Sequence, residues 1–563
     1  MKSITWRTKY KELVNWTDEQ LEVFEAVTNC DDHIAILACA GGGKTFTAVY
    51  GVIATLLNKA LKNKEECKIQ VLAFNEHIAT EIRENSRIPQ KVKVSTFHGL
   101  GMGLLYKYFR GESPILRDNK YYDLAKKRLE LIERINCPSW LRFEDEDERH
   151  EFLRAVKDIV EYAQSSLTKL ETESLMKMAG YYGLLCPGGR LTLEAACDIA
   201  LDCIEQGIEL AERERVISYS DMIYLPIVWN IYVHKKTHVI TDEFQDMSAA
   251  RLVLLNKFAM SGARIILVGD LQQSIAGFSG ADPRSAQKAY EKFDPLRLHL
   301  SCCFRCGSSI LDLARVFQSR IMPAPGAEEG LVTVDSPDDM FRFLGKGDLV
   351  ISRYNAPLID KCLEACFAGV RAKIAGDILI TKIKSYIKRA AKRNSSLVDG
   401  LVMVANSEIN NLEASGRQSE IIGVDRIKDS LIRIIKEYKT TDIEQILRIA
   451  DELFNPENPD VLFSTIHKIK GGEADTVWLL GSNLIPNDNS MVAWQNEQER
   501  NLAYVAITRA KRRLHLVPYV TDEETEGTVE DLLKHPYGGM ELPRPPVKVP
   551  APPKPGQLSL SLF

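Results

Sequence analysis

The sequence predicts an α/β protein with two parallel-sheet domains, each interrupted by a helical insertion. Short apolar runs alternate with longer stretches of helical periodicity. The runs are almost continuously apolar, which is typical of parallel strands covered on both faces. They fall into two blocks that are far apart in the chain. A length of 563 residues also exceeds the roughly 250–300 residues that one hydrophobic core usually supports.

We interpret the apolar runs as strands in chain order. In the first block they are Ile34–Ala38, Ile69–Phe74, Val92–Phe97, His238–Asp242 and Ile265–Asp270. In the second block they are Leu298–Ser301, Leu349–Arg353, Leu462–His467, Val477–Gly481 and Leu514–Val517.

Stretches of 3.6-residue periodicity interrupt both blocks and predict the helical insertions. The first domain is expected in residues 1–106 and 217–292, around an insertion at 107–216. The second is expected in residues 293–381 and 454–521, around a smaller insertion at 382–453. In the remaining tail, residues 522–563, seven prolines between Pro543 and Pro555 predict an extended linker.

The composition is that of a globular protein, with 45% apolar and 26% charged residues. No apolar run approaches the ~18 residues of a membrane span, and residues 1–10 lack the apolar stretch of a signal peptide. We therefore expect a cytoplasmic protein without a membrane partner, whose twelve cysteines are reduced. The chain has 72 Lys and Arg residues and 77 Asp and Glu residues. Because it has no overall excess of positive charge, any surface that binds nucleic acid must depend on a local cluster of basic residues.

A glycine-rich loop follows the first expected strand. It reads Cys39-Ala40-Gly41-Gly42-Gly43-Lys44-Thr45 and leads into a helical pattern, which is the context of a phosphate-binding P-loop. Glycines let backbone N–H groups turn toward phosphates, and the helix N-terminus adds positive potential. Lys44 would hold the β- and γ-phosphates and the Thr45 hydroxyl would bind Mg²⁺. Ala38 stands where the strict motif has glycine.

Two carboxylates end the strand His238–Asp242. Asp242 and Glu243 follow an apolar run, so one carboxylate is placed for Mg²⁺ and the other to orient or deprotonate a water. Alone, this pattern also fits a solvated strand end. Its coupling to Gly43-Lys44-Thr45 favours hydrolysis of a nucleoside triphosphate.

Several further segments occur in a fixed order. They are Thr17–Gln20, Ala73–Asn75, Ser95–Gly99, Asp242–Asp246, Val268–Ile275, Phe304-Arg305, Ser464–Glu473 and Leu502–Ala510. Together they resemble the motifs of the UvrD/PcrA/Rep family of superfamily 1A DNA helicases, over about residues 15–520. The small second insertion resembles the compact F-box DNA helicase branch of that family.

The resemblance implies two RecA-like domains of the P-loop NTPase class, with ATP bound between them. Gln20 would read the adenine, Phe304 would stack on the base and Glu473 would hold the ribose. Gln273 would sense the γ-phosphate, and Arg305 and Arg509 would act as arginine fingers. Closing and reopening of the two domains on a bound strand would then produce stepping.

The same resemblance implies a set of residues that contact DNA. They are Phe74, Asn75, Thr96, Phe97, His98, Phe278, Thr465 and His467. The alternative for the ring-bearing members is packing on the core. Ala276 and Ser279 stand where the family has an aromatic residue and an arginine, which puts the strength of unwinding in doubt.

Three cysteines, Cys302, Cys303 and Cys306, lie beside Arg305. A zinc or iron–sulfur site lacks an obvious fourth ligand, so we interpret them as buried thiols.

The tail segment Gln557–Phe563 resembles the bacterial sliding-clamp-binding motif. Short anchors on a flexible tether suit recognition in a groove. The resemblance implies that Gln557, Leu558, Leu560, Leu562 and Phe563 contact the clamp. It also implies a bacterial, plasmid or phage origin and association with the nucleoid.

The sequence thus predicts an ATP- and Mg²⁺-dependent enzyme that translocates on single-stranded or forked DNA as a monomer. By resemblance it moves 3′ to 5′ in replication, repair or recombination, tethered to the sliding clamp. Two alternatives stay open. One is a translocase that removes bound proteins and unwinds weakly, and the other is an ATP-switched, clamp-bound adaptor.

Overall fold

The computed structural model describes residues 16–84, 88–136, 138, 141–143, 146–184, 186, 190–275, 277, 282, 284–376, 378–393, 396–414, 421–487 and 493–519. Phe278, the linker and the expected clamp-binding residues lie outside these ranges, as do Ala276 and Ser279. The described chain forms two compact units, which are treated separately below. The first contains residues up to Ala38 and Gly43–Leu300, and the second contains Cys39–Gly42 and the residues from Ser301 onward.

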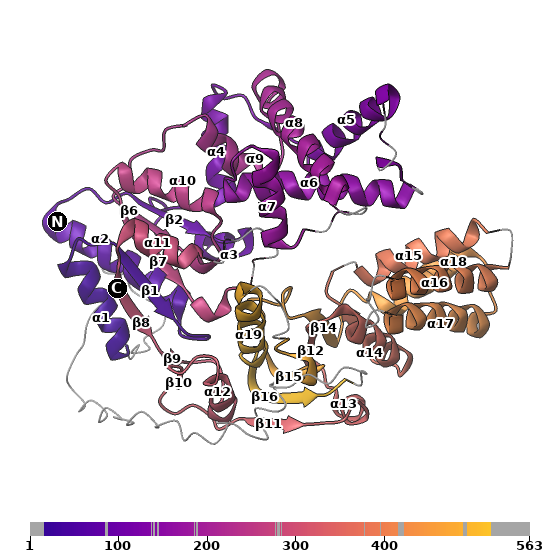
Figure 1. The fold of residues 1–563 in the computed structure, drawn as a ribbon. Helices are drawn as coiled ribbons and strands as arrows, with labels where there is room; N and C mark the ends of the chain where they lie inside the picture. Colours follow the sequence, from indigo (N-terminus) through magenta and orange to yellow (C-terminus); the bar gives the residue numbers. More distant parts are fainter. Residues whose placement is uncertain are drawn as a thin grey trace. The chain divides into compact units, whose positions relative to one another are not determined.

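A six-stranded parallel sheet forms the centre of the first unit (Figure 1). Its order is β3-β2-β6-β7-β1-β8. These strands are β3 (Lys93–Thr96), β2 (Ile69–Ala73), β6 (His238–Thr241), β7 (Arg264–Gly269), β1 (Ile34–Ala38) and β8 (Leu296–Leu300). Because consecutive side chains point to opposite faces, Ile34 and Ile36 enter one core while Ala35 enters the other.

Helices cover both faces of this sheet. On one face lie α1 (Asp18–Asn29), the helical turn η1 (Thr45–Gly51) and α2 (Val52–Asn63). On the other lie α4 (Phe97–Tyr108), α10 (Ala249–Met260) and α11 (Ser285–Phe293). Helix α3 (Glu76–Glu84) connects β2 with β3. Burial on both faces explains why these strands read as continuous apolar runs.

One predicted strand belongs to a different sheet than expected. The sequence places the run Leu298–Ser301 in the second block, but β8 pairs in parallel with β1, from Ile34 opposite Leu296 to Ala38 opposite Leu300. The expected boundary at residues 292/293 is therefore wrong, and the units divide between Leu300 and Ser301. An apolar run gives no indication of which sheet it will join as an edge strand.

The helical insertion of the first unit has its own core. It contains α5 (Lys120–Asn136), α6 (Glu146–Ser166), α7 (Thr172–Tyr182) and α8 (Arg190–Glu214). A short parallel pair, β4 (Ile115–Leu116) and β5 (Val216–Ile217), closes the insertion at its base. The chain then enters α9 (Asp221–Val228), which packs on α4.

A buried ion pair joins this insertion to α9. Lys120 Nζ lies 2.6 Å from Asp221 Oδ2, and neither side chain has exposed area. The Tyr121 hydroxyl donates to Asp221 Oδ1 at 2.6 Å, and Gln164 donates to the same oxygen at 3.0 Å. The Asp221 carboxylate thus connects α5, α6 and α9.

Replacing Asp221 by alanine is expected to lower the free energy of unfolding of the first unit by about 3–5 kcal/mol. The substitution leaves the buried Lys120 ammonium without its counter-ion. Urea denaturation measures the change. The control Glu173→Ala breaks an ion pair whose side chains are 81% and 74% exposed and should leave the curve unchanged. Equal effects of the two substitutions would contradict this account.

The second unit also contains a six-stranded parallel sheet, in the order β11-β16-β15-β12-β14-β13. These strands are β11 (Leu331–Val334), β16 (Ala510–Val517), β15 (Ala474–Leu480), β12 (Leu349–Ser352), β14 (Val461–Thr465) and β13 (Ala372–Ile374). A parallel pair, β9 (Cys302–Cys303) and β10 (Met322–Pro323), lies apart from it. Strands β11 and β13 lie at the two edges of the sheet and have no counterpart among the expected strands, because they are short.

Helices α12 (Ser308–Ala314), α13 (Pro337–Phe343), α14 (Asn355–Phe367) and α19 (Ala493–Ile507) accompany this sheet. The insertion contains α15 (Ile378–Ala391), α16 (Leu397–Ala414), α17 (Ile421–Tyr438) and α18 (Ile443–Phe454). One hydrophobic core runs from the sheet through α14 into these four helices. None of the helices in the described ranges combines the length and apolar content that crossing a bilayer requires.

Candidate functional site

The order of the first sheet brings the predicted P-loop and carboxylates to one edge. Strands β6, β7 and β1 are neighbours and parallel, so the residues that follow their carboxyl ends meet there. Lys44 follows β1, Asp242 and Glu243 follow β6, and Asp270 follows β7. Within the loop, Gly41 and Gly43 have φ values of 65° and 70°, a left-handed conformation that glycine adopts without strain.

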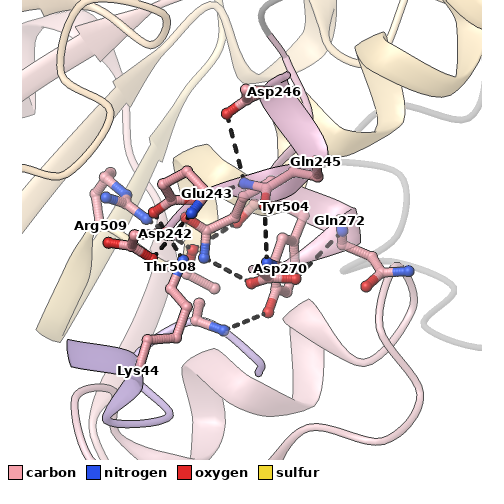
Figure 2. Close-up of polar contacts among 12 residues, drawn as sticks. Lys44, Asp242, Glu243, Gln245, Asp246, Asp270, Gln272, Tyr504, Thr508 and Arg509 are labelled. Atoms are coloured by element: carbon pink, nitrogen blue, oxygen red, sulfur yellow. Dashed lines mark hydrogen bonds and ion pairs between the residues drawn. The ribbon is translucent and has the colours of Figure 1, made fainter. Parts of the chain in front are cut away.

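Lys44 forms an ion pair with Glu243 at this edge (Figure 2). Nζ lies 2.8 Å from Oε1, and both side chains are 14% exposed. Burial lowers the pKa of Lys44, but the charges of Glu243, Asp242 and Asp270 outweigh burial and raise it above its usual range. The ammonium is therefore held charged among three carboxyl groups.

Glu243 is fixed in an unusual backbone conformation. Its φ of 52° is left-handed, which is uncommon for a residue with a side chain. The Glu243 N–H donates to Asp242 Oδ1 at 2.9 Å, and the Gln245 amide donates to Glu243 Oε2. Such strain at a functional site persists when surrounding bonds determine the geometry.

Asp270 is fully buried and orients Gln273. The Gln273 amide donates to Asp270 Oδ2 at 2.7 Å, and the Gln272 N–H donates to Oδ1 at 3.2 Å. Burial raises the pKa of Asp270 to about 6, although the charge of Lys44 opposes the rise. Gln245 links the two strand ends, because its Oε1 accepts the Asp270 N–H at 3.2 Å while its amide binds Glu243 (Figure 2).

Gln20 lies at the start of α1, on the face of the sheet that η1 also covers. Its Oε1 accepts the Thr17 N–H at 2.9 Å in a capping box. Its amide donates to Thr47 Oγ1, in η1, at 2.7 Å. Trp16 stacks on Phe46 with ring centres 5.1 Å apart. These contacts anchor α1 to the helical turn that begins at Thr45.

The donor set of the first unit fits a nucleotide with Mg²⁺. The Lys44 ammonium and the left-handed Gly43 suit phosphate, and the Thr45 hydroxyl with the Asp242 carboxylate supplies the oxygen ligands that Mg²⁺ prefers. Helix η1 begins at Thr45, so its N-terminus adds positive potential.

In the second unit, Arg305 and Glu473 form an ion pair, with Nε 2.5 Å from Oε2. Lys511 Nζ lies 2.9 Å from the other carboxylate oxygen. Burial raises the pKa of Glu473, but Lys511 and Arg305 together lower it below its usual range. Arg305 also donates to the Thr508 carbonyl at 3.2 Å, and the neighbouring Phe304 is 52% exposed.

Arg509 is 1% exposed and anchored within the second unit. Its Nε donates to the Val505 carbonyl at 2.9 Å and its Nη1 to the Gly472 carbonyl at 3.0 Å. Burial, with the positive charge of Arg305, lowers the pKa of Arg509 to about 10. Arg305 and Arg509 therefore lie close together, and the Thr508 carbonyl accepts a hydrogen bond from Arg305.

Two of the three cysteines near Arg305 are buried. Cys303 and Cys306 are 0% and 3% exposed, and the Cys306 thiol donates to the Thr508 carbonyl at 3.7 Å. Cys302 is partly buried. Across the described part of the chain, no group of three or more His, Cys, Asp or Glu is arranged to hold a metal ion.

The residues expected to contact DNA in the first unit lie at the carboxyl ends of β2 and β3 or directly after them. Phe74 is partly buried and Asn75 is exposed, with Asn75 Oδ1 accepting the Ile78 N–H at 2.9 Å. Thr96 caps α4 by accepting the Gly99 N–H at 3.0 Å. Phe97 is 3% exposed and belongs to the core. Its ring therefore packs inside the unit, which is the alternative to DNA contact given above.

Two residues outside the expected set, Arg251 and Tyr219, contact the residues at this edge. The Arg251 guanidinium lies 5.3 Å from the ring centre of Phe74 and 5.9 Å from that of Phe97. Tyr219 is 53% exposed and meets His98 edge to face at 5.8 Å. Neither residue belongs to a motif segment, so only the fold reveals their position.

In the second unit, Thr465 is the last residue of β14 and His467 follows two residues later. Thr465 Oγ1 accepts the Lys468 N–H at 3.4 Å. Burial lowers the pKa of His467 to about 4, and the charges of Arg353 and Lys470 add to the effect. Arg353 itself is bound to Glu499 at 2.8 Å.

Acid is expected to destabilise the first unit through His98. Burial, with a smaller contribution from Arg251, lowers the His98 pKa from 6.5 to about 4. The unfolded chain then binds the proton first as the pH falls, so stability is lost between about pH 6.5 and 4. His98→Gln should remove part of that loss in thermal unfolding at stepped pH, while His238, whose pKa burial also lowers to about 4, retains its share. An unchanged pH dependence in the variant would contradict the assignment.

Comparison with known families identifies the chain. The UvrD/REP helicase N-terminal domain matches residues 16–294, and the UvrD-like helicase C-terminal domain matches residues 232–520. The ATP-dependent DNA helicase Rep of Buchnera aphidicola subsp. Acyrthosiphon pisum is 22% identical over 91% of this chain and 96% of its own length. The F-box DNA helicase protein 1 of Schizosaccharomyces pombe is 23% identical over 90% of this chain.

A third relative matches a shorter part of the chain at higher identity. The ATP-dependent DNA helicase srs2 of Schizosaccharomyces pombe is 31% identical over 23% of this chain. The chain spans 15% of srs2 and 58% of the F-box helicase, less than two thirds of either protein. The predicted fold class is confirmed, since both sheets are parallel and the two units are RecA-like. With one family model alone covering more than half of its residues, the chain belongs to the UvrD/Rep family of helicases.

Proposed function

We propose that this chain is an ATP- and Mg²⁺-dependent DNA translocase and helicase. The observation that carries the proposal is the Lys44–Glu243 ion pair, 2.8 Å long, set beside Asp242 and Asp270 at the carboxyl edge of a parallel sheet. Hydrolysis of ATP needs a cation that binds the phosphates, a carboxylate that binds Mg²⁺ and a second carboxylate that activates water. Lys44, Asp242 and Glu243 would supply them.

Lys44 changes partner in the proposed reaction. When its ammonium moves to the β- and γ-phosphates, Glu243 is released to orient a water and accept its proton. Thr45 and Asp242 hold Mg²⁺, which when bound neutralises charge on the phosphates. Gln273, oriented by Asp270, positions the same water.

The second unit contributes positive charge. We assign Arg305 and Arg509 to the transferred phosphoryl group, because planar guanidinium groups match its oxygens. Phe304 and Gln20 would hold the base, and Glu473 the ribose. Since Arg305 is bound to Glu473 in this structure, its release toward phosphate would be coupled to ribose binding.

We propose that the DNA strand contacts Phe74, Asn75, Thr96, His98, Thr465 and His467. The charge of Arg251 and the exposed ring of Tyr219 favour a single strand at the first unit. Alternate closing and reopening of the two units would move a monomer along the strand, 3′ to 5′, during replication, repair or recombination.

Tethering to a sliding clamp through residues 557–563 would raise the local concentration of the enzyme at replication sites. The test is surface plasmon resonance of the whole chain on a bacterial sliding clamp. Leu562→Ala with Phe563→Ala should abolish binding, because these two side chains fill pockets on the clamp. Equal binding by the variant would contradict the tether.

A forked duplex carrying a streptavidin block on its 3′ arm separates the proposed activity from its alternatives. A helicase unwinds the fork with ATP and displaces the block. A protein-removing translocase displaces streptavidin and leaves the duplex intact. An ATP-switched adaptor does neither, and that result would contradict the proposed function.

A further inference from the structure

Lysines gather at the amino end of the first sheet, opposite the carboxyl edge described above. Lys68 immediately precedes β2, Lys93 begins β3, and Lys236 lies two residues before β6. These three strands are neighbours. Lys68 and Thr237 exchange hydrogen bonds, since the Thr237 N–H donates to the Lys68 carbonyl at 2.9 Å and Thr237 Oγ1 accepts the Lys68 N–H at 2.9 Å.

The neighbouring helices add charge and aromatic rings. Lys107, near the end of α4, has its Nζ 2.5 Å from His234 Nε2. Tyr108 stacks on Trp229 with ring centres 4.6 Å apart. Tyr232 is 67% exposed. We call this surface the lysine edge; it comprises Lys68, Lys93, Lys107, Lys236, Tyr108 and Tyr232.

The lysines of this surface act on one another. Burial lowers the pKa of Lys236, and the positive charges of Lys93, Lys107 and Lys68 lower it further. Lys68 is paired with Glu66, but its side chain remains 56% exposed. On the next strand, β7, the first residue Arg264 is buried and donates to the Asp32 and Val27 carbonyls. The sheet lysines of this surface therefore lie at or just before the amino ends of β3, β2 and β6, and Lys107 adds a charge from α4.

The lysine edge is separate from the proposed stepping site. Phe74 and Thr96 mark the carboxyl ends of β2 and β3, while Lys68 and Lys93 mark their amino ends. A five-residue strand is about 16 Å long. The amino and carboxyl ends of these strands are therefore too far apart for one side chain to contact DNA at both. Bulk charge conceals the cluster, because the whole chain has a net charge of −5.

We propose that the lysine edge is a second binding site for single-stranded nucleic acid. Ammonium groups at the ends of adjacent strands contact phosphates, and the exposed ring of Tyr232 offers a face on which a base stacks. The combination of local positive charge and exposed aromatic rings is what binding of single strands without sequence preference requires. The site goes beyond the stepping function, because it holds a strand without the residues that bind ATP.

The test is fluorescence anisotropy with a labelled thymidine oligonucleotide of about 40 nucleotides, measured over a range of salt concentrations. The variant Lys68→Ala/Lys93→Ala/Lys107→Ala removes three exposed charges. It should weaken binding at least about tenfold at low salt and reduce the slope of log K against log salt by about 2. Tyr232→Ala should weaken binding by about tenfold with the salt slope unchanged.

A matched control removes three other exposed lysines. Lys169→Ala/Lys177→Ala/Lys346→Ala changes the net charge equally, at side chains that are 74%, 74% and 85% exposed. This control should bind like the unsubstituted chain. An equal loss in both triple variants, no loss in either, or a loss for hairpin duplex only would overturn the proposal.

A second readout separates this proposal from the stepping function. Stimulation of ATP hydrolysis by a short oligonucleotide should be the same in the lysine-edge variant and the unsubstituted chain. If short oligonucleotides stimulate neither protein, the stepping function fails. The lysine edge is still judged by the anisotropy difference between the two triple variants.

Discussion

The substitution Glu243→Gln is expected to lower ATP turnover by about 10²–10⁴-fold and to leave nucleotide binding intact. Glutamine keeps the shape of the side chain, and its Oε1 still accepts a hydrogen bond from Lys44. What it loses is the carboxylate that accepts a proton from water. Steady-state hydrolysis and titration with a fluorescent nucleotide measure the two effects separately.

The control for this experiment is Glu25→Gln, an exposed position on α1, which should leave turnover unchanged. Unchanged turnover in Glu243→Gln would refute the assignment of Glu243 as the base. A loss of nucleotide binding equal to the loss of turnover would mean instead that Glu243 stabilises bound ATP before hydrolysis and does not act in the hydrolysis step.

The substitution Lys44→Ala is expected to lower turnover by about 10³-fold or more and, unlike Glu243→Gln, to weaken nucleotide binding as well. It removes the ammonium that lies among Glu243, Asp242 and Asp270. Burial already raises the pKa of Asp270 to about 6, and Lys44 opposes that rise. The Asp270 pKa should therefore increase further in the variant.

Lys62→Ala, an exposed position on α2, controls for the loss of one positive charge. It should hydrolyse ATP like the unsubstituted chain. Nucleotide titrations at several pH values test the electrostatic part of the account. If Lys44→Ala retains turnover within a few-fold, the phosphate-binding role of the loop is wrong.

Much of this architecture could be predicted from local sequence. Ile34–Ala38 was predicted as a strand and forms β1 with the same bounds. Strands covered on both faces produce continuous apolar runs, and the glycines of a P-loop are required by backbone geometry. The carboxylates of Asp242 and Glu243 were predictable because they follow such a run.

Other features depend on pairing between distant segments. The edge strand β8 joins β1 across more than half of the first unit's chain, and no local pattern encodes that choice. Gln245 is within a motif, yet its role in linking Glu243 to Asp270 follows from its contacts alone. Lys68, Lys93 and Lys236 are scattered in sequence and meet because β3, β2 and β6 are neighbours.

Phe97 illustrates a different limit of sequence reasoning. Its place in a motif segment implied contact with DNA, whereas its side chain is 3% exposed in the core. An aromatic residue after a strand can either pack inward or present a ring to a ligand. The choice depends on the packing of α4 and α10, which the sequence does not reveal locally.

ATP hydrolysis by the purified chain, with and without single-stranded DNA, tests the central claim most directly. Lys44→Ala is measured beside it to exclude a contaminating enzyme. The account predicts that DNA strongly stimulates turnover and that the stimulation is lost in Lys44→Ala. Turnover that DNA leaves unchanged would contradict a motor that couples the ATP site to a bound strand.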